Sequence, residues 1–124
     1  MASILVVEDD AQFRRFLVEV LEDAGYAVNV AGGGAAALAQ LASQPVDVVL
    51  TDLVMPGQDG ISLIRVLRKT RPDLPIIAMS GRGRTGLHMD SLELVRLLGA
   101  DGTLQKPFTA EVLETALRQV LSRH

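Results

Sequence analysis

Five short apolar segments alternate with helical patterns along the chain, and this alternation constrains the fold more than any other feature. The expected strands cover residues 3–7, 27–31, 46–51, 75–79 and 102–105. A regular alternation of strands and helices predicts a parallel sheet with helices on both faces and right-handed connections. We therefore expect the α/β fold class, as a flavodoxin-like doubly wound sheet of five parallel strands in the order 2-1-3-4-5.

The expected helices have recognisable ends and apolar faces. Asp10 is the expected N-cap of the first helix, Gly25 its stop, and Thr109 the cap of the last helix. Asp90 with Glu93 three residues later resembles a capping box, which predicts the start of a fourth helix. A third helix is expected over residues 61–70. In the second helix, which the glycines at 32–34 open, the expected apolar side chains are Ala35, Leu38 and Leu41.

Length and composition limit the classes of function. A chain of 124 residues suits one domain, residues 1–124, and 48% hydrophobic residues allow a substantial core. The absence of cysteine excludes disulfides, thiolate metal sites and cysteine nucleophiles. A net charge of −3 argues against direct nucleic-acid binding. No apolar run approaches the roughly 20 residues that span a bilayer, and the first residues lead straight into a strand, so we expect a cytoplasmic protein without membrane association.

Acidic residues follow two of the expected strands. Glu8, Asp9 and Asp10 come directly after the first strand, and Asp52 comes directly after the third. In the predicted strand order these two strands are neighbours, and their carboxyl ends meet at one crevice. Lys106 ends the fifth segment at the same edge. Acids alone would fit a helix N-terminus, which favours negative charge, but acids together with a lysine suggest a site for a hard cation and a phosphoryl group.

This set of residues suits phosphoryl transfer to a carboxylate. Asp9 and Asp52 would bind Mg²⁺ directly, a backbone carbonyl of the following turn would add a ligand, and Glu8 would act through water. Asp52 would then attack a phosphoryl donor and form an aspartyl phosphate. Lys106 would pair with the phosphoryl oxygens, and the Ser80 hydroxyl would donate a hydrogen bond to one of them.

Four sequence motifs, in order from end to end of the chain, resemble those of one family, the receiver domains of bacterial two-component response regulators. They are ILVVEDD at 4–10, TDLVMPGQDG at 51–60, MSG at 79–81 and KPF at 106–108. The resemblance implies that Asp52 is the phosphoacceptor, Glu8 and Asp9 the acid pair, and the Val54 carbonyl a Mg²⁺ ligand. It also implies Ser80 as the switch hydroxyl, Lys106 as the phosphate-sensing lysine, and a cis peptide bond between Lys106 and Pro107.

The chain departs from the family pattern at three places. Thr103 stands where the family often has an aromatic residue, which argues against a switch based on a rotating ring. The stretch from Ser80 to Lys106 is longer than usual by roughly one helical turn, and we assign the extra length to residues 81–89. Val54 and Arg82 occupy the positions that flank the phosphoryl group in the family.

The resemblance predicts a phospho-accepting signalling module rather than an enzyme, with slow autodephosphorylation at most. Its donor would be a histidine kinase or a histidine phosphotransfer protein. Its output would be a downstream protein target or an output domain, contacted through helix four, strand five and helix five after movement of the 81–89 loop. One alternative is a small Mg²⁺-dependent phosphatase or phosphotransferase with an aspartyl-phosphate intermediate, although Val54 stands where a second acid is needed. The other is a pseudo-receiver, an interaction module that is not phosphorylated.

Overall fold

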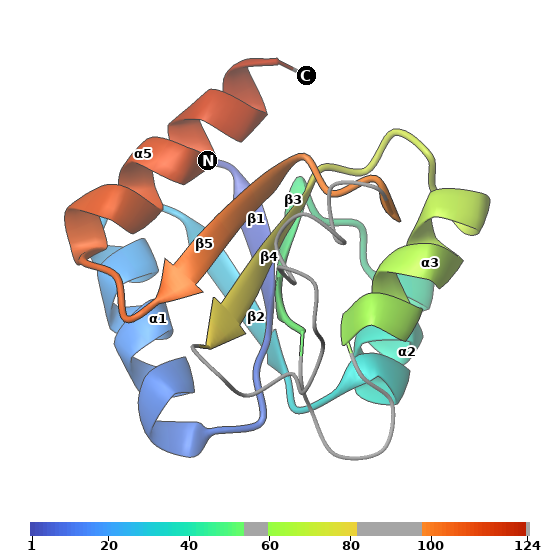
Figure 1. Ribbon diagram of the computed structural model, residues 1–124, viewed down its shortest axis with the longest axis horizontal. Coiled ribbons are helices and arrows are strands. Elements are labelled where there is room, and N and C mark those ends of the chain that lie inside the picture. The colour runs from blue at the N-terminus through green and yellow to red at the C-terminus, as the bar shows by residue number, and fades with distance from the viewer. Residues whose placement is uncertain (54–59, 82–97, 124) are drawn as a thin grey trace.

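The computed structural model describes residues 1–53, 60–81 and 98–123. Figure 1 shows a central sheet with helices on either side. The elements, in chain order, are β1 (Ser3–Val7), α1 (Ala11–Asp23), β2 (Ala27–Ala31), α2 (Gly34–Ser43), β3 (Val48–Asp52), α3 (Gly60–Thr70), β4 (Ile76–Gly81), β5 (Gly102–Lys106) and α5 (Ala110–Ser122). Several predictions lie outside the described residues: the Val54 carbonyl, the 82–89 part of the loop with Arg82, and the fourth helix with its Asp90–Glu93 cap.

The sheet has the predicted strand order, β2-β1-β3-β4-β5, and every neighbouring pair is parallel. In the register, Val7 pairs with Thr51, Asp52 with Met79, and Gly81 with Lys106. The arrowheads of β4 and β5 point toward the lower part of Figure 1. All five strands therefore end at the same edge, as the α/β prediction requires.

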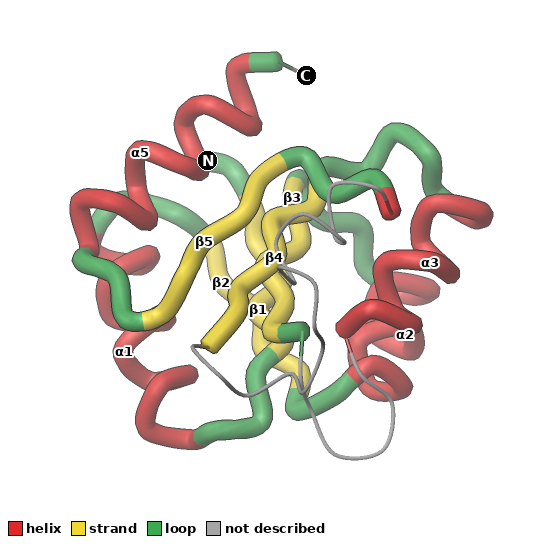
Figure 2. Tube along the Cα trace, in the orientation of Figure 1, coloured by secondary structure: helices red, strands yellow, loops and turns green. Residues whose placement is uncertain are grey.

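Alternate side chains of the strands build two separate core layers, one on each face of the sheet. Figure 2 shows α1 and α5 on one side of the sheet and α2 and α3 on the other. Leu5, Val7 and Val49 pack with α2 and α3, whereas Ile4, Val6 and Leu50 pack with α1 and α5. The central strands β1, β3 and β4 are buried on both faces, which explains why they appear as continuous apolar runs in the sequence.

The predicted helix ends are confirmed where the structure describes them. The Asp10 side chain accepts hydrogen bonds from the backbone N–H groups of Gln12 and Phe13, and Thr109 accepts one from Val112. Gly25 follows α1 with φ of 94°, a conformation that favours glycine. These caps satisfy backbone donors that the first turn of each helix leaves unpaired.

Three strands extend further toward the site edge than expected. β3 runs over Val48–Asp52 rather than 46–51, β4 continues to Gly81, and β5 includes Lys106. The apolar pattern stops earlier because the last residues of these strands are polar or small, yet their backbones stay in the parallel ladder. In α2 the prediction for Ala35 is wrong: Ala35 is exposed, and Ala37 is the buried residue of that turn.

One arginine joins three segments at the opposite edge of the sheet. Arg68, near the end of α3, donates from Nε to the Gly99 carbonyl at 2.7 Å and forms an ion pair with Asp101 at 2.7 Å. The same Asp101 oxygen accepts the Ile76 backbone N–H at 2.8 Å, just where β4 begins. Sequence reasoning missed this connection, because nothing in the spacing relates residue 68 to residue 101. Among the described helices, none has both the length and the apolar content to cross a membrane.

Candidate functional site

The site lies at the carboxyl edge of the sheet, where β1 and β3 end side by side. Glu8 directly follows β1, and Asp52 is the last residue of β3. With Asp9 they bring three carboxylates together, each offering an oxygen within 4.8 Å of the others. Glu8 and Asp52 are only 1% and 5% exposed, whereas Asp9 is open to solvent. The structure thus brings together the acids that the predicted strand order placed in one crevice.

Glu8 is the most unusual of these acids, because a glutamate is rarely buried so completely. Its Oε2 accepts the backbone N–H of Asp10 at 3.1 Å, and its Oε1 accepts from Lys106. Burial raises the pKa of the Glu8 carboxyl group above its ordinary value, while the hydrogen bonds from Lys106 and Asp10 act in the opposite direction. The charge of Asp52 raises the pKa of Glu8 further. The carboxylates therefore repel one another at close range.

Lys106 reaches two of the acids from the end of β5. Its Nζ lies 2.7 Å from Glu8 Oε1 and 3.2 Å from Asp52 Oδ2. The peptide bond from Lys106 to Pro107 is cis, as the family resemblance implied. A single ammonium offsets only part of the charge of three carboxylates. A donor set of carboxylate oxygens with remaining negative charge suits a hard divalent cation such as Mg²⁺.

An aromatic cluster lies beside the lysine. Nζ of Lys106 is 4.3 Å from the centroid of the Phe13 ring on α1. Phe13 in turn packs against Phe16 at 5.7 Å and against Phe108 at 5.6 Å, in the second case edge to face. Sequence reasoning gave Phe13 and Phe16 no role at the site. A clue was present: the three phenylalanines of the chain all stand close in sequence to Glu8 or Lys106.

Ser80 is at the same edge of the sheet, one residue beyond Met79, which pairs with Asp52. It is buried, pairs with Gln105 of β5, and its hydroxyl lies 3.5 Å from the Gly81 carbonyl. The structure therefore places Ser80 between the strand of Asp52 and the strand of Lys106.

The backbone around Asp52 is tightly held. The Thr51 hydroxyl donates to the Asp52 carbonyl at 2.9 Å, and the Leu53 N–H donates to Met79 at 3.0 Å. A Cβ atom added to Gly60 would overlap the Asp52 carbonyl oxygen, so α3 begins in direct contact with the end of β3. The backbone that carries the Asp52 side chain is thus held by β4 and by α3.

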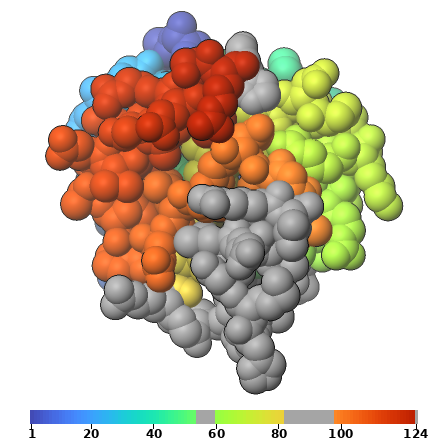
Figure 3. Space-filling view, turned by 45° about the horizontal axis from the view of Figure 1, so that its top comes forward, coloured from blue at the N-terminus to red at the C-terminus, as the bar shows by residue number. Residues whose placement is uncertain are grey.

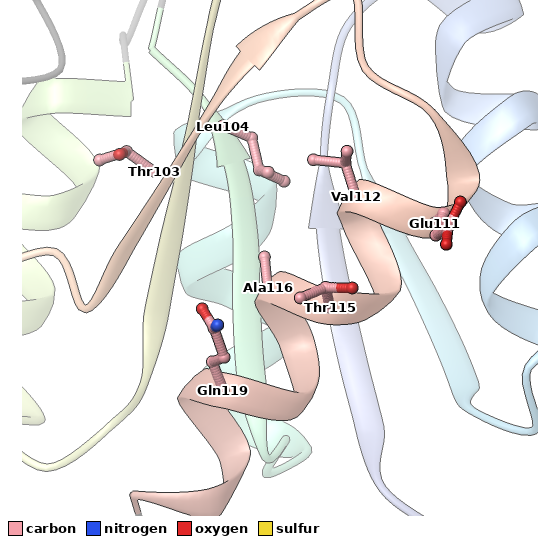
Figure 4. A pocket seen from close by; sticks show the side chains of 7 residues that line it. All are labelled: Thr103, Leu104, Glu111, Val112, Thr115, Ala116 and Gln119. Carbon is pink, nitrogen blue, oxygen red and sulfur yellow. The ribbon is translucent and has the colours of Figure 1, made fainter.

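A groove lies between β5 and α5, away from the acids. Figure 3 shows the surface of these two elements in orange and red, and Figure 4 shows the side chains that line the groove. It has a volume of about 460 Å³ and includes Val112, which is 48% exposed. Its lining comprises Thr103, Leu104, Glu111, Val112, Thr115, Ala116 and Gln119.

Known proteins share this sequence pattern. The model of the response regulator receiver domain family matches residues 4–118. The chain is 45% identical to the response regulator receiver protein CpdR of Brucella abortus over 91 residues, 73% of this chain and 76% of CpdR. It is 38% identical over 120 residues to the response regulator MprA of Mycobacterium avium, which covers 97% of this chain. The match covers 51% of MprA, so the chain spans about half the length of that relative.

Solved structures agree with the fold. A putative response regulator from Chloroflexus aurantiacus superposes with a TM-score of 0.90 at 30% identity and covers 98% of both chains. The chemotaxis protein CheY4 of Vibrio cholerae superposes with a TM-score of 0.86 at 31% identity, over 97% of this chain and 98% of CheY4. These likenesses extend over the whole sheet and so include the edge where the acids and Lys106 meet.

Proposed function

The chain belongs to the response regulator receiver domain family of two-component systems, and from this premise we propose that it accepts a phosphoryl group on Asp52 with the help of Mg²⁺. The donor would be a histidine kinase or a histidine phosphotransfer protein in the cytoplasm. The observation that carries the proposal is the meeting of Glu8, Asp9 and Asp52 with Lys106 at one edge of the sheet.

The residues present fit a magnesium ion. Asp9 and Asp52 offer carboxylate oxygens, Glu8 would act through a metal-bound water, and we assign the Val54 carbonyl as a further ligand from the family pattern. When bound, the ion would neutralise the acids and polarise the phosphoryl oxygens. The close approach of three carboxylates, which is costly without a counter-ion, supports this assignment.

The transfer step would use Asp52, Lys106 and Ser80 of this site, a bound Mg²⁺ ion and the phosphodonor. An Asp52 carboxylate oxygen attacks the phosphorus and forms an O–P bond, while the bond between phosphorus and the donor breaks and the donor keeps that electron pair. Lys106 then exchanges a carboxylate partner for a phosphoryl oxygen, a charge-assisted contact of the same kind. Ser80 donates its hydroxyl hydrogen to another phosphoryl oxygen. The protein is an acceptor in this scheme, and hydrolysis of its own aspartyl phosphate is slow.

The phosphorylated form would present a changed surface to a downstream protein target or to an output domain. The described part of that surface is formed by β5 and α5. The groove with exposed Val112 supports this role, because it offers apolar contact area beside the strand that carries Lys106. The expected contribution of helix four belongs to the same proposal.

Intact mass spectrometry tests the proposal. We expect wild-type protein incubated with acetyl phosphate and Mg²⁺ to gain the mass of one phosphoryl group. Asp52→Asn should gain none, and excess chelator should abolish the gain in wild type. Asp23→Asn, which changes an exposed acid at the end of α1, is the matched control and should be labelled like wild type.

Each result separates the proposal from its rivals. Full labelling of Asp52→Asn, or undiminished labelling of wild type in chelator, would contradict it. No labelling of wild type under any condition would favour a pseudo-receiver. Rapid multiple turnover of the phosphodonor would favour a phosphatase or phosphotransferase.

A further inference from the structure

We propose that Phe13 is a positioning residue for Lys106, whose ring face keeps the lysine ammonium at the acid cluster, ready for the phosphoryl group. This inference rests on the proposed function of Asp52. It concerns a residue of α1 that takes no part in the transfer itself and acts only through the lysine.

The Lys106 ammonium has two carboxylates and one aromatic ring close to it. Lys106 Nζ is 2.7 Å from Glu8, 3.2 Å from Asp52 and 4.3 Å from the centroid of the Phe13 ring. A cation within about 6 Å of an aromatic centroid is attracted by the negative face of the ring. The lysine side chain is 19% exposed, so water competes only partly for the ammonium. The flexible lysine is thus held by two carboxylates and one ring.

The Phe13 ring is itself held in place by two other rings. Phe16 packs against it from the next turn of α1, and Phe108 packs against it edge to face. Phe108 follows Lys106 by two residues, so the same segment supplies both the cation and one support of the ring. All three phenylalanines of the chain are used in this cluster. Three of the four aromatic residues of the chain therefore belong to the cluster beside the proposed phosphate-sensing lysine.

The Phe13 ring can hold the lysine even when the carboxylates bind a cation. A carboxylate that gives its oxygens to a divalent cation attracts a lysine less strongly. The ring is uncharged, and its attraction for the ammonium does not depend on the state of Glu8 or Asp52. Phe13 therefore keeps Lys106 near the site during the step in which the carboxylates turn to the cation. Its loss should slow phosphorylation, since the lysine would no longer be held near the incoming phosphoryl oxygens.

The test compares Phe13→Leu with Phe16→Leu. Both variants keep an apolar side chain on α1, but only the first removes the ring beneath the ammonium. With acetyl phosphate and Mg²⁺, we expect Phe13→Leu to lower the initial rate of labelling by about three- to tenfold, which lies within the range for a single cation–π contact. Phe16→Leu keeps an apolar side chain packed against the Phe13 ring and leaves the ring itself in place, so its rate should stay within about twofold of wild type. Phe13→Tyr keeps an aromatic face and should restore most of the rate.

A double-variant cycle distinguishes positioning from a general effect on packing. In a Lys106→Met background, Phe13→Leu should have almost no further effect on the labelling rate, because the cation it positions is already gone. The same fold-loss in both backgrounds would overturn the proposal. So would a Phe16→Leu loss as large as that of Phe13→Leu.

NMR of the unphosphorylated protein tests the contact between Phe13 and Lys106 without any labelling. The ring face should shift the NMR signals of the Lys106 ε-methylene protons upfield in wild type, and Phe13→Leu should return them toward the position of a free lysine. If wild type is not labelled at all but the upfield shift is present, the proposed function fails and the contact stands. A second outcome is that wild type is labelled, its Lys106 signals resemble those of free lysine, and Phe13→Leu is labelled at the wild-type rate. In that case the inference about Phe13 fails and the proposed function of Asp52 stands.

Discussion

At the scale of single residues, the site combines a buried glutamate, a buried aspartate and one lysine. Glu8 loses much of its hydration by burial, and the charge of Asp52 adds to the cost of ionising it. Lys106 offsets part of that cost through a contact of 2.7 Å. The acids lie close enough together for a bound cation to reduce their repulsion. The proposed function has Lys106 exchange one of them for a phosphoryl oxygen.

The raised pKa of Glu8 predicts a pH-dependent stability. Because its pKa is higher in the folded protein than in the unfolded chain, where a glutamate titrates near about 4.3, folding favours the protonated form. The stability that this group contributes is fully present below the unfolded pKa and is lost as the pH rises through the folded pKa. Relative to Glu8→Gln, wild type should therefore lose unfolding free energy as the pH rises from about 4 toward 7.

Urea unfolding of both proteins in the presence of a chelator measures this difference. The chelator removes any metal that would bind Glu8 and change its titration. A stability difference that does not vary with pH, or that varies in the opposite direction, would contradict the burial argument. The control variant is Asp23→Asn, which removes an exposed acid of α1.

At the scale of elements, the start of α3 is pressed against the end of β3. Gly60 donates its backbone N–H to the Leu53 carbonyl at 3.0 Å, and its Cα faces the Asp52 carbonyl so closely that no side chain fits. Within β3, the Thr51 hydroxyl donates a hydrogen bond to the Asp52 carbonyl. The backbone of Asp52, the proposed phosphoacceptor, is thus held where a strand meets a helix.

This contact predicts that Gly60→Ala is strongly destabilising. The added methyl group has to displace the backbone of Asp52, so we expect a loss of about 3 kcal/mol in the free energy of unfolding. The folded fraction of Gly60→Ala should also be labelled more slowly than wild type. Gly32→Ala is the matched control, since an added Cβ there meets nothing within 4 Å, and its effect should be within about 0.5 kcal/mol. Equal stability of the two variants in urea unfolding would contradict this account of α3.

The success of prediction from sequence differed between parts of the molecule for physical reasons. Strand order and the Asp10 and Thr109 caps were predicted correctly, because apolar runs and capping side chains are local signals. The strand ends at Asp52 and Lys106 were placed too early, because hydrogen bonding continues beyond the apolar pattern. The Phe13–Lys106 contact was missed, since it joins residues far apart in sequence. The same holds for the contact of Arg68 with Asp101.

At the scale of the whole molecule, β1 and β3 occupy the middle of the sheet, while Lys106 reaches the site from the edge strand β5. The lysine therefore connects the acid cluster to the element that borders the groove along α5 (Figure 4). A movement of Lys106 toward a phosphoryl group would shift the balance between two arrangements of β5 and its neighbours. Lys106 would thus act in signalling rather than in folding.

Lys106→Ala tests that assignment. The fold should persist, because Glu8 retains its hydrogen bond from Asp10 and can take up a proton. The change in amide NMR shifts on phosphorylation should be smaller in the variant than in wild type, above all in β5 and α5. Equal changes in both proteins would show that the lysine does not transmit the signal.

We propose that Asp52, and no other acid of the cluster, carries the phosphoryl group. Borohydride reduces an aspartyl phosphate to homoserine, which marks the modified residue permanently for peptide mass spectrometry. After incubation with acetyl phosphate and Mg²⁺, the account predicts homoserine at position 52 and none at position 9. Reduction at Asp9 or Glu8 in place of Asp52, or no reduced residue in a protein that has gained phosphoryl mass, would contradict it.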